Sequence, residues 1–413
     1  MTSERKVYVG LATEPHQAAT PVGLLKLARR GVVESGEYAY GTQYLASPTA
    51  IPLNSEHMPL TNSAIVLSER RLRDGGTLPL TFRDALPDSW GRRVLEAQHG
   101  RTLDDIDALL MTNADRVGAM VFSESLPIEI AQAETNLLEL EEMSDAVKRL
   151  ELGMDISPEM CRLLQRGGTL GGARPKATFV HDNRRWIAKF PAIADDHDVE
   201  LLEICLLKLA ELCGIEVSPS RLESIQSGHV ILISRFDRVG NIDNERRIHY
   251  LSASALLNVP YESNSGSYVE FAQVIRKFSS NPTHDLDQLY RRLVFNLIVD
   301  NTDDHVKNHG MLHVSDGQYQ LAPAFDIVMQ LQNLGYQELA IFAGNNVSSI
   351  RSATDAAPYF GLKKEEAESI IQSIQGITHR ELMTIAEHFG ANTALKERIK
   401  RCLNRQHELI NSQ

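Results

Sequence analysis

Apolar and polar positions in the first part of the chain predict a mixture of strands and helices. Residues 6–12 and 118–123 are short apolar runs typical of strands. Residues 82–99 repeat apolar side chains at helical spacing, and one face of this predicted helix carries Leu86, Trp90, Val94 and Leu95. A shorter helix is expected over residues 102–111. This order is typical of a small mixed domain.

The remainder of the chain changes from strand signals to helical signals. Predicted strands cover residues 177–180, 186–190, 229–236 and 311–314. A helical stripe covers residues 198–213, a strongly apolar helix covers 286–299, and two or three amphipathic helices cover 363–410. The acidic stretch 124–142 predicts a linker that passes into a helix. We therefore predict three domains: an N-terminal subdomain (1–125), a β-rich lobe (126–240) and a helical lobe (241–413).

Composition restricts the class of protein. The 413 residues are 43% hydrophobic and 23% charged, which is ordinary for a globular protein and excludes disordered or fibrous chains. No run of about 18 apolar residues is present, so we expect no membrane contact. Four cysteines without a CxxC element favour neither disulfides nor structural zinc, and we expect a reducing cytoplasm. A net charge of −12 makes the chain a poor sole carrier of nucleic-acid affinity, although a basic partner could bring it to DNA.

The sharpest chemical signal is the polar segment 300–308, D-N-T-D-D-H-V-K-N, which follows the apolar helix. Asp303 and Asn308 have the D-x-x-x-x-N spacing of a kinase catalytic loop, in which the Asp accepts a proton and the Asn holds Mg²⁺. Lys307 could neutralise phosphate charge. Asp326 follows an apolar stretch further along and could be a second Mg²⁺ ligand. The alternative for Asp326 is a turn or a helix N-cap.

Two upstream segments could meet phosphate groups. Four glycines within residues 167–172 would let backbone amides approach phosphate oxygens, although a flexible turn is the alternative. Lys189 lies inside an apolar strand, where a kinase places the lysine that pairs with the α- and β-phosphates. The alternative is an edge lysine that points to solvent.

The turn after residues 230–234 could be a linker between lobes. Its backbone could meet adenine, and Asp237 could bind the ribose; a surface turn with an Asp–Arg pair is the alternative. His305, His309 and His313 lie four residues apart, as metal ligands on a helix would, but Gly310 and the strand signal at 311–314 argue against that helix. No G-x-S-x-G nucleophile elbow is present.

Taken together, these segments resemble the HipA-like serine/threonine kinases, the toxin subunits of toxin–antitoxin pairs. Residues 169–176 are similar to the family's S-x-x-G-A-x-x-K segment, and residues 301–308 to its N-T-D-x-H-x-K-N segment. Further similar segments are 86–89 (L-P-D-S), 187–191 (the ATP-lysine strand), 234–238 (R-F-D-R), 256–262 (L-N-V-P) and 321–326 (L-A-P-x-Y-D). The similarity spans nearly the whole chain. It implies an α+β, two-lobed, protein-kinase-like fold with a small N-terminal subdomain and a helical C-terminal lobe.

The resemblance also implies ATP and Mg²⁺ as ligands, with Asp303 as the general base and with Asn308 and Asp326 on the metal. The implied nucleotide-binding residues are Gly171, Gly172, Ala173, Arg174, Pro175, Lys176, Lys189, Ser234, Arg235, Phe236, Asp237, His305, Val306, Lys307, Asn308, Phe325 and Asp326. Thr169 occupies the family's autophosphorylated Ser position, and Phe325 stands where the family usually has Tyr. Asp304 adds a second carboxylate beside the proposed base.

The sequence thus predicts a cytoplasmic ATP- and Mg²⁺-dependent protein kinase that acts as a toxin. The resemblance suggests a translation protein, such as an aminoacyl-tRNA synthetase, as the substrate. It also suggests a HipB-like helix-turn-helix antitoxin, through which the chain would reach DNA indirectly. The alternatives are an inactive nucleotide-binding scaffold in a repressor complex and a small-molecule kinase.

Overall fold

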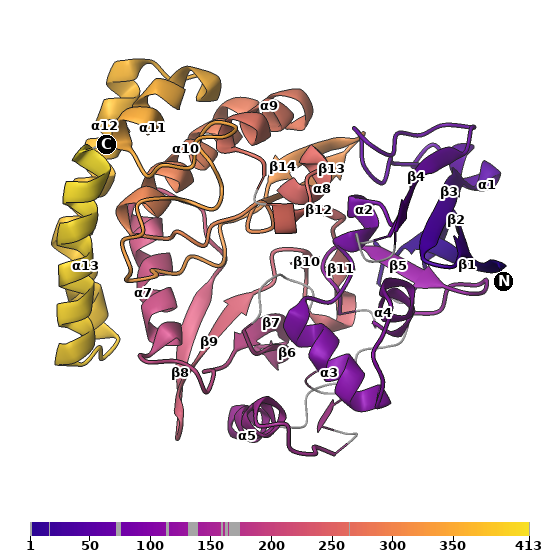
Figure 1. Cartoon of the computed structure of the whole chain (residues 1–413), viewed down its shortest axis with the longest axis horizontal. Coiled ribbons are helices and arrows are strands. Elements are labelled where there is room, and N and C mark those ends of the chain that lie inside the picture. Colours follow the sequence, from indigo (N-terminus) through magenta and orange to yellow (C-terminus); the bar gives the residue numbers. More distant parts are fainter. Residues whose placement is uncertain are drawn as a thin grey trace.

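The computed structural model describes residues 2–15, 17–71, 76–112, 115–130, 139–157, 160–161, 164, 174–263 and 265–412. The molecule has two lobes, and the N-terminal sheet lies at one side of them (Figure 1). This arrangement confirms the expected α+β, two-lobed class. Within those ranges, no helix is both long enough and apolar enough to cross a bilayer.

The N-terminal part of the chain (residues 2–123) builds an antiparallel five-stranded sheet in the order β4–β3–β2–β1–β5. Its strands are β1 (Thr2–Leu11), β2 (Thr20–Arg30), β3 (Val33–Tyr40), β4 (Ile65–Arg71) and β5 (Met120–Ser123). Four helices accompany it: α1 (Thr42–Leu45), α2 (Leu80–Arg83), α3 (Ser89–His99) and α4 (Asp105–Met111). Alternation along the strands buries Val9, Leu25 and Tyr38 on one face, against Phe82. The sheet ends shortly before the domain limit predicted at residue 125, which stays a prediction.

The single helix predicted over residues 82–99 is wrong, because the chain breaks into α2 and α3. Pro87 disfavours a helical conformation at Leu86. Asp88 then caps the new helix, and its Oδ1 accepts a hydrogen bond from the backbone N–H of Gly91 at 2.7 Å. The break carries Asp88 toward the second sheet, where it has a role described below.

The second sheet is antiparallel and four-stranded, in the order β6–β7–β9–β8. Its strands are β6 (Lys176–His181), β7 (Arg184–Lys189), β8 (Ser220–Ile225) and β9 (Gly228–Ser234). Helix α7 (Val199–Leu212) packs against β8 and β9. Another core joins Ala188 and Val230 of this sheet to Met143 of α5 (Leu140–Glu151) and to Trp90 of α3. The N-terminal part therefore supplies a piece of the β-rich lobe's core.

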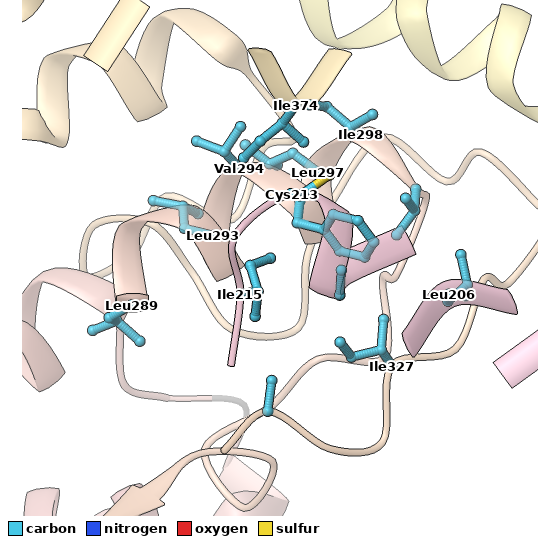
Figure 2. Close-up of a cluster of buried hydrophobic side chains, with 14 of the residues drawn as sticks. Leu206, Cys213, Ile215, Leu289, Leu293, Val294, Leu297, Ile298, Ile327 and Ile374 are labelled. Carbon is cyan, nitrogen blue, oxygen red and sulfur yellow. The ribbon is translucent and has the colours of Figure 1, made fainter. Parts of the chain in front are cut away.

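The helical lobe follows a short hairpin, β10 (Arg238–Val239) and β11 (Arg246–Arg247). Its helices are α8 (Ala253–Leu257), α9 (Tyr268–Phe278), α10 (Pro282–Ile298), α11 (Ile350–Ala356), α12 (Lys364–His388) and α13 (Thr393–Ser412). A three-stranded sheet contains β12 (Tyr250–Ser252), β13 (Gly310–Ser315) and β14 (Gln318–Leu321). Figure 2 shows Leu293 and Leu297 of α10 beside Cys213, Ile215 and Ile374 in the main core. This core fixes α10, which leads into the polar segment at residue 300.

Helix α7 allows a matched test of this core. Leu206 is fully buried, whereas Leu212 on the same helix is 54% exposed. We predict that Leu206→Ala lowers the free energy of unfolding by about 2–5 kcal/mol, because the cavity left behind cannot collapse completely. Leu212→Ala should change it by less than about 0.5 kcal/mol. Denaturant unfolding followed by circular dichroism measures both, and equal losses would contradict the packing of α7.

Candidate active site

Two adjoining cavities lie between the four-stranded sheet and the helical lobe. The smaller one is lined by Lys176, Ile187, Lys189, Ile233, Ser234, Arg235, Phe236, Phe325 and Asp326. The larger one, of about 570 Å³, reaches from Arg174 to Asp303. Lys176, Lys189 and Asp326 line both cavities, so these three side chains mark the point where they meet.

Lys189 is held at this meeting point by carboxylates from both lobes. It is the last residue of β7, and its Nζ lies 2.5 Å from Glu203 Oε1 and 2.6 Å from Asp326 Oδ1. Burial alone would lower the pKa of this lysine, but the charges of Asp326 and Glu203 raise it above the usual value. Because β7 is central in its sheet and the side chain is buried, the alternative of a solvent-facing edge lysine does not hold.

Glu203 is a site residue that the sequence reasoning missed. It lies on α7, 1% exposed, among apolar neighbours such as Leu202 and Ile204. A carboxylate at a buried helical position needs a cation as partner. The available signal was therefore a glutamate inside an otherwise apolar helical stretch. Glu200, also on α7 and also buried, carries the same signal and has its own partner, Arg174.

The polar segment after α10 is held in place through contacts of its first residue, Asp300. Asp300 has a left-handed φ of 57°, and its Oδ2 accepts hydrogen bonds from the backbone N–H groups of Gln332 and Asn333, both at 2.9 Å. Helix α13 reaches the same point, because Cys402 Sγ lies 3.4 Å from Asp300 Oδ2. The Asn333 side chain donates to the Cys402 carbonyl at 3.0 Å. These contacts fix where the next residues of the segment lie.

Asp303 and Asp304 are adjacent in sequence but lie in opposite environments. Asp304 is buried and is hydrogen-bonded by Tyr268 Oη and by His309 Nε2, which lies 2.9 Å from its Oδ1. Burial alone would raise its pKa, but His309 and Tyr268 hold the pKa below the usual range. Asp303 instead lines the larger cavity. The structure therefore gives Asp304 a supporting place and leaves Asp303 as the carboxylate that a substrate can reach.

The environment of Asp303 makes it a stronger base than an ordinary aspartate. The surrounding protein removes part of its hydration, and the negative charges of Asp326 and Glu338 act in the same direction, against the charge of His305. Together they raise the pKa of Asp303 to about 6. At neutral pH the carboxylate remains ionised and can accept a proton.

Asn308 and Asp326 have the properties of hard-metal ligands. The Asn308 side chain is buried and its Nδ2 donates to the Asp303 carbonyl at 3.4 Å, but within the described residues no donor reaches its Oδ1. Lys189 is the main charge that holds the pKa of Asp326 down, at about 2, despite burial. An ionised carboxylate and an unsatisfied amide oxygen are the donors that Mg²⁺ prefers, so these residues fit that ion. Asp326 pairs with Lys189 and caps none of the described helices, unlike the N-cap alternative.

The rival three-histidine site is not formed by these three residues, all of which the structure describes. His309 is bonded to Asp304, and His313 packs edge-on against the Tyr319 ring. Across the described ranges, no group of three His, Cys, Asp or Glu side chains is placed to hold a metal ion.

The structure describes only part of the predicted phosphate loop. Thr169, Gly171, Gly172 and Ala173 lie outside the described residues. Arg174 makes two bonds of 2.7 Å to the carboxylate of Asp195. Lys176 Nζ lies 2.8 Å from Asp88 Oδ2, and both side chains are buried. Pro175 lines neither of the two cavities.

The ion pair between Lys176 and Asp88 gives the L-P-D-S segment a structural place. Asp88 caps α3 with one oxygen and holds Lys176 with the other, while the Trp90 indole donates to the Lys176 carbonyl at 3.0 Å. The N-terminal part of the chain thus positions a lysine that lines both cavities. The sequence alone pointed to this segment without assigning it a role.

Residues 305–308 do not line either of the two cavities, although Asn308 Nδ2 donates to the Asp303 carbonyl. The His305 ring lies 5.7 Å from the Tyr261 ring, and Lys307 Nζ lies 5.2 Å from the same ring. Val306 is buried, and its carbonyl accepts a hydrogen bond from Ser254. Their expected contact with phosphates stays a prediction.

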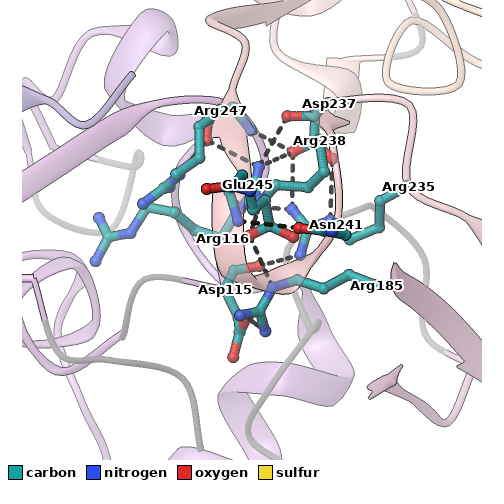
Figure 3. Close-up of polar contacts among 11 residues, drawn as sticks. Asp115, Arg116, Arg185, Arg235, Asp237, Arg238, Asn241, Glu245 and Arg247 are labelled. Carbon is teal, nitrogen blue, oxygen red and sulfur yellow. Dashed lines mark hydrogen bonds and ion pairs between the residues drawn. The ribbon is translucent and has the colours of Figure 1, made fainter. Parts of the chain in front are cut away.

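The hinge segment (residues 234–238) divides between cavity wall and interior. Ser234, Arg235 and Phe236 line the smaller cavity, and the Phe236 ring stacks on Phe325 at 5.2 Å between centroids. Asp237 is fully buried behind that wall, and its oxygens bind Arg235, Arg238 and the Gly118 backbone (Figure 3). The hypothesis that Asp237 binds a ribose is therefore wrong, because no part of its carboxylate faces the cavity.

Comparisons with known proteins identify several that are similar to this chain. Two curated relatives from Sinorhizobium fredii, "Putative kinase Y4mE" and "Putative kinase Y4dM", are 29% and 22% identical over 160 and 201 residues. The matches cover 37% and 45% of this chain and only 36% and 47% of the relatives, so they span less than half the length of those proteins. Among solved structures, HipA from the Shewanella oneidensis HipA, HipB and operator DNA complex matches with a TM-score of 0.69 at 14% identity. That match covers 96% of both chains and shows a shared fold.

Two family models also match. The HipA N-terminal domain matches residues 16–123, and the HipA-like C-terminal domain matches residues 168–381. Because the second of these alone covers more than half of the chain, the protein belongs to the HipA-like family.

Proposed function

We propose that this protein is an ATP- and Mg²⁺-dependent serine/threonine protein kinase. The observation that carries the proposal is the placement of Lys189, Asp326 and Asp303 around one cavity. Lys189 is paired with Glu203 as a kinase strand lysine is paired with a helix glutamate. Membership of the HipA-like family and the resemblance to proteins named as kinases support the same activity.

In this proposal each residue has a role that its environment supports. Lys189 and Lys176 neutralise phosphate charge, and Ser234, Arg235 and Phe236 form the wall against the adenine. Asp326 and Asn308 would hold Mg²⁺, which when bound supplies neutralisation of charge on the transferring phosphoryl group. Arg174 lines the larger cavity and is likewise paired with carboxylates, those of Asp195 and Glu200, so its contact with a phosphate stays part of the proposal.

Asp303 orients the acceptor hydroxyl and takes its proton. Its pKa, raised to about 6 by burial and by neighbouring negative charge, leaves it ionised at pH 7 and more basic than a free aspartate. Most of the catalytic effect comes from positioned charges, since phosphoryl transfer needs little covalent participation from the protein.

We further propose that the kinase is the toxin of a toxin–antitoxin pair. The similar fold from Shewanella oneidensis was solved with HipB and operator DNA, which supports a HipB-like helix-turn-helix antitoxin as partner. The net charge of −12 supports contact with DNA through that partner rather than directly. A translation protein such as an aminoacyl-tRNA synthetase is the proposed substrate. An inactive scaffold and a small-molecule kinase are the competing functions.

The direct test is phosphate transfer by the purified protein and by its Asp303→Asn variant. We predict that wild type with labelled ATP and Mg²⁺ labels a protein in a cell lysate. Asp303→Asn should lower the rate by about 10²–10⁴-fold, because the base is lost. ATP binding, followed by thermal shift, should survive in the variant. Asp316→Asn, which changes an exposed turn aspartate, is the matched control and should keep full activity.

Other outcomes of that test select the alternatives. ATP binding without any phosphate transfer would favour the inactive scaffold. Label that appears in a small metabolite and in no protein would favour the small-molecule kinase. Equal activity of wild type and Asp303→Asn would remove Asp303 from the proposed role.

The pH dependence of the rate offers a second prediction. A general base works only when deprotonated, so the rate should rise with pH through the pKa of Asp303, about 6, and level off above it. Glu338→Gln should move this rise to lower pH, because the Glu338 charge helps to raise that pKa. Initial rates between pH 5 and 8 at saturating Mg-ATP measure both profiles. A profile that Glu338→Gln leaves in place would assign the titration to another group.

Thr169 supplies a third prediction, on self-inhibition. We propose that it is the autophosphorylated residue, and it lies outside the described part of the chain. A phosphate adds roughly two negative charges beside the site for ATP phosphates and should repel them. Wild type preincubated with ATP should therefore lose activity and carry label at Thr169 by mass spectrometry. Thr169→Ser should behave alike, whereas Thr169→Ala should stay active; loss of activity without label at Thr169 would contradict the mechanism.

A further inference from the structure

Seven charged side chains, three of them from the hinge segment itself, form a cluster beside the smaller cavity (Figure 3). This arginine cluster consists of Asp115, Arg185, Arg235, Asp237, Arg238, Glu245 and Arg247, and Arg116 adds its main-chain carbonyl. It lies where three parts of the chain meet: the N-terminal part, strand β7 with the hinge segment, and the hairpin β10–β11. Charges buried in this way persist only when each one has partners.

Asp237 is the central acceptor of the arginine cluster. Arg235 donates to both of its oxygens, at 2.9 Å and 2.7 Å, and Arg238 Nη1 donates to Oδ2 at 2.7 Å. The backbone N–H of Gly118 adds a bond of 2.7 Å to the same oxygen. A residue of the hinge segment is therefore bonded directly to the backbone of the N-terminal part.

Backbone carbonyls of the N-terminal part complete the cluster. Arg235 donates to the carbonyls of Asp115 at 2.6 Å and Arg116 at 3.0 Å. Arg247 donates to the Gly118 carbonyl from two nitrogens, at 3.0 Å and 2.8 Å. Arg238 donates to the Arg116 carbonyl at 2.8 Å. Three arginines thus grip one short stretch, residues 115–118, through its main chain.

The same stretch packs closely against Tyr250 of β12. Gly118 has a φ of 74°, and a Cβ built there would lie 3.1 Å from the Tyr250 backbone nitrogen. The Tyr250 ring lies 5.5 Å from the Phe236 ring, which lines the smaller cavity. Residues 115–118 are therefore connected to the cavity wall by a continuous series of contacts through Tyr250 and Phe236.

The cluster also reaches the strand that carries the central lysine. Arg185, at the start of β7, binds Asp115 at 3.0 Å and Glu245 at 2.8 Å, and its carbonyl accepts from the Arg235 backbone N–H at 3.2 Å. Lys189 is the last residue of β7. The cavity wall formed by residues 234–236, which we call the hinge wall, and the strand that ends at Lys189 are therefore both bonded to residues 115–118.

We propose that residues 115–118 of the N-terminal part position the hinge wall of the ATP site, with Asp237, Arg238 and Arg247 as positioning residues. This inference rests on the proposed binding of ATP at the smaller cavity. None of these three side chains lines that cavity, so their effect on ATP passes through Arg235 and Phe236. Because such coupling is reciprocal, bound ATP stabilises the attachment of the N-terminal part.

The experiment compares full-length variants that weaken the cluster to different degrees. Asp237→Asn removes the central charge, and Arg247→Lys keeps a charge but loses the two-nitrogen grip on Gly118. Arg246→Gln is the control, since Arg246 joins the same parts through an exposed pair with Glu14 at 3.2 Å. The readouts are the ATP dissociation constant by calorimetry, KM for ATP and kcat, and amide hydrogen exchange at residues 234–238.

We expect Asp237→Asn to weaken ATP binding and raise KM about tenfold, and Arg247→Lys about threefold, with kcat within about twofold of wild type. Exchange at residues 234–238 should accelerate in both, and Arg246→Gln should resemble wild type. ATP affinity within about twofold of wild type in both folded variants would overturn the proposal. A loss confined to kcat would overturn it too, because a hinge wall acts on binding.

The experiment separates failure of this proposal from two other outcomes: variants that do not fold, and a protein that binds no ATP. If neither variant folds, exchange in wild type decides: ATP should slow it at residues 115–119, and an unchanged rate there overturns the coupling. If wild type binds no ATP, the proposed function fails. Exchange at residues 234–238 in the variants then still shows whether residues 115–118 hold the hinge segment, and unchanged exchange would overturn that as well.

Discussion

Burying the ammonium group of Lys189 costs free energy unless carboxylates surround it, and the relation between the two lobes follows from this requirement. Glu203 approaches from α7 of the β-rich lobe and Asp326 from the helical lobe, so the cation registers one lobe against the other. The same rule governs the other cations of the site. Lys176 has Asp88, and Arg174 has Asp195 and Glu200. The carboxylates therefore hold Lys189, Lys176 and Arg174 in place before any ligand binds, and this reduces the reorganisation that binding requires.

Asp303 and Asp304 show how different surroundings shift the pKa of two identical side chains in opposite directions. Tyr268 and His309 satisfy Asp304 and fix it as an ionised support beneath the segment. Asp303 receives no such donors in the described residues and faces other negative charges, so its affinity for a proton rises. Two neighbouring positions in the chain thus hold one carboxylate that supports the segment and one that lines the larger cavity.

The sequence could predict which segments form the site and their order along the chain. It could not predict which residues pair between segments that are far apart in the sequence. Strands β7 and β9, helix α10 and the polar segment after residue 300 follow from apolar periodicity and short motifs, because both are local properties. The break within residues 82–99 was missed, since the apolar stripe continued across Pro87. Glu203 was missed, and Asp237 was given to the ribose, because tertiary packing decides that each carboxylate is almost completely buried. Gly118, which binds Asp237, is 119 residues away from it.

The anchoring of Asp300 by α13 has a consequence for the order of synthesis. Cys402 follows Asp300 by 102 residues, so the ribosome makes the segment that carries Asp303 well before it makes the helix that supports it. At about 5–20 residues per second, this interval lasts roughly 5–20 seconds. During this interval the nascent chain contains Asp303 but lacks the C-terminal helix that supports its segment. The segment that carries Asp303 therefore gains its full support only as translation approaches the end of α13.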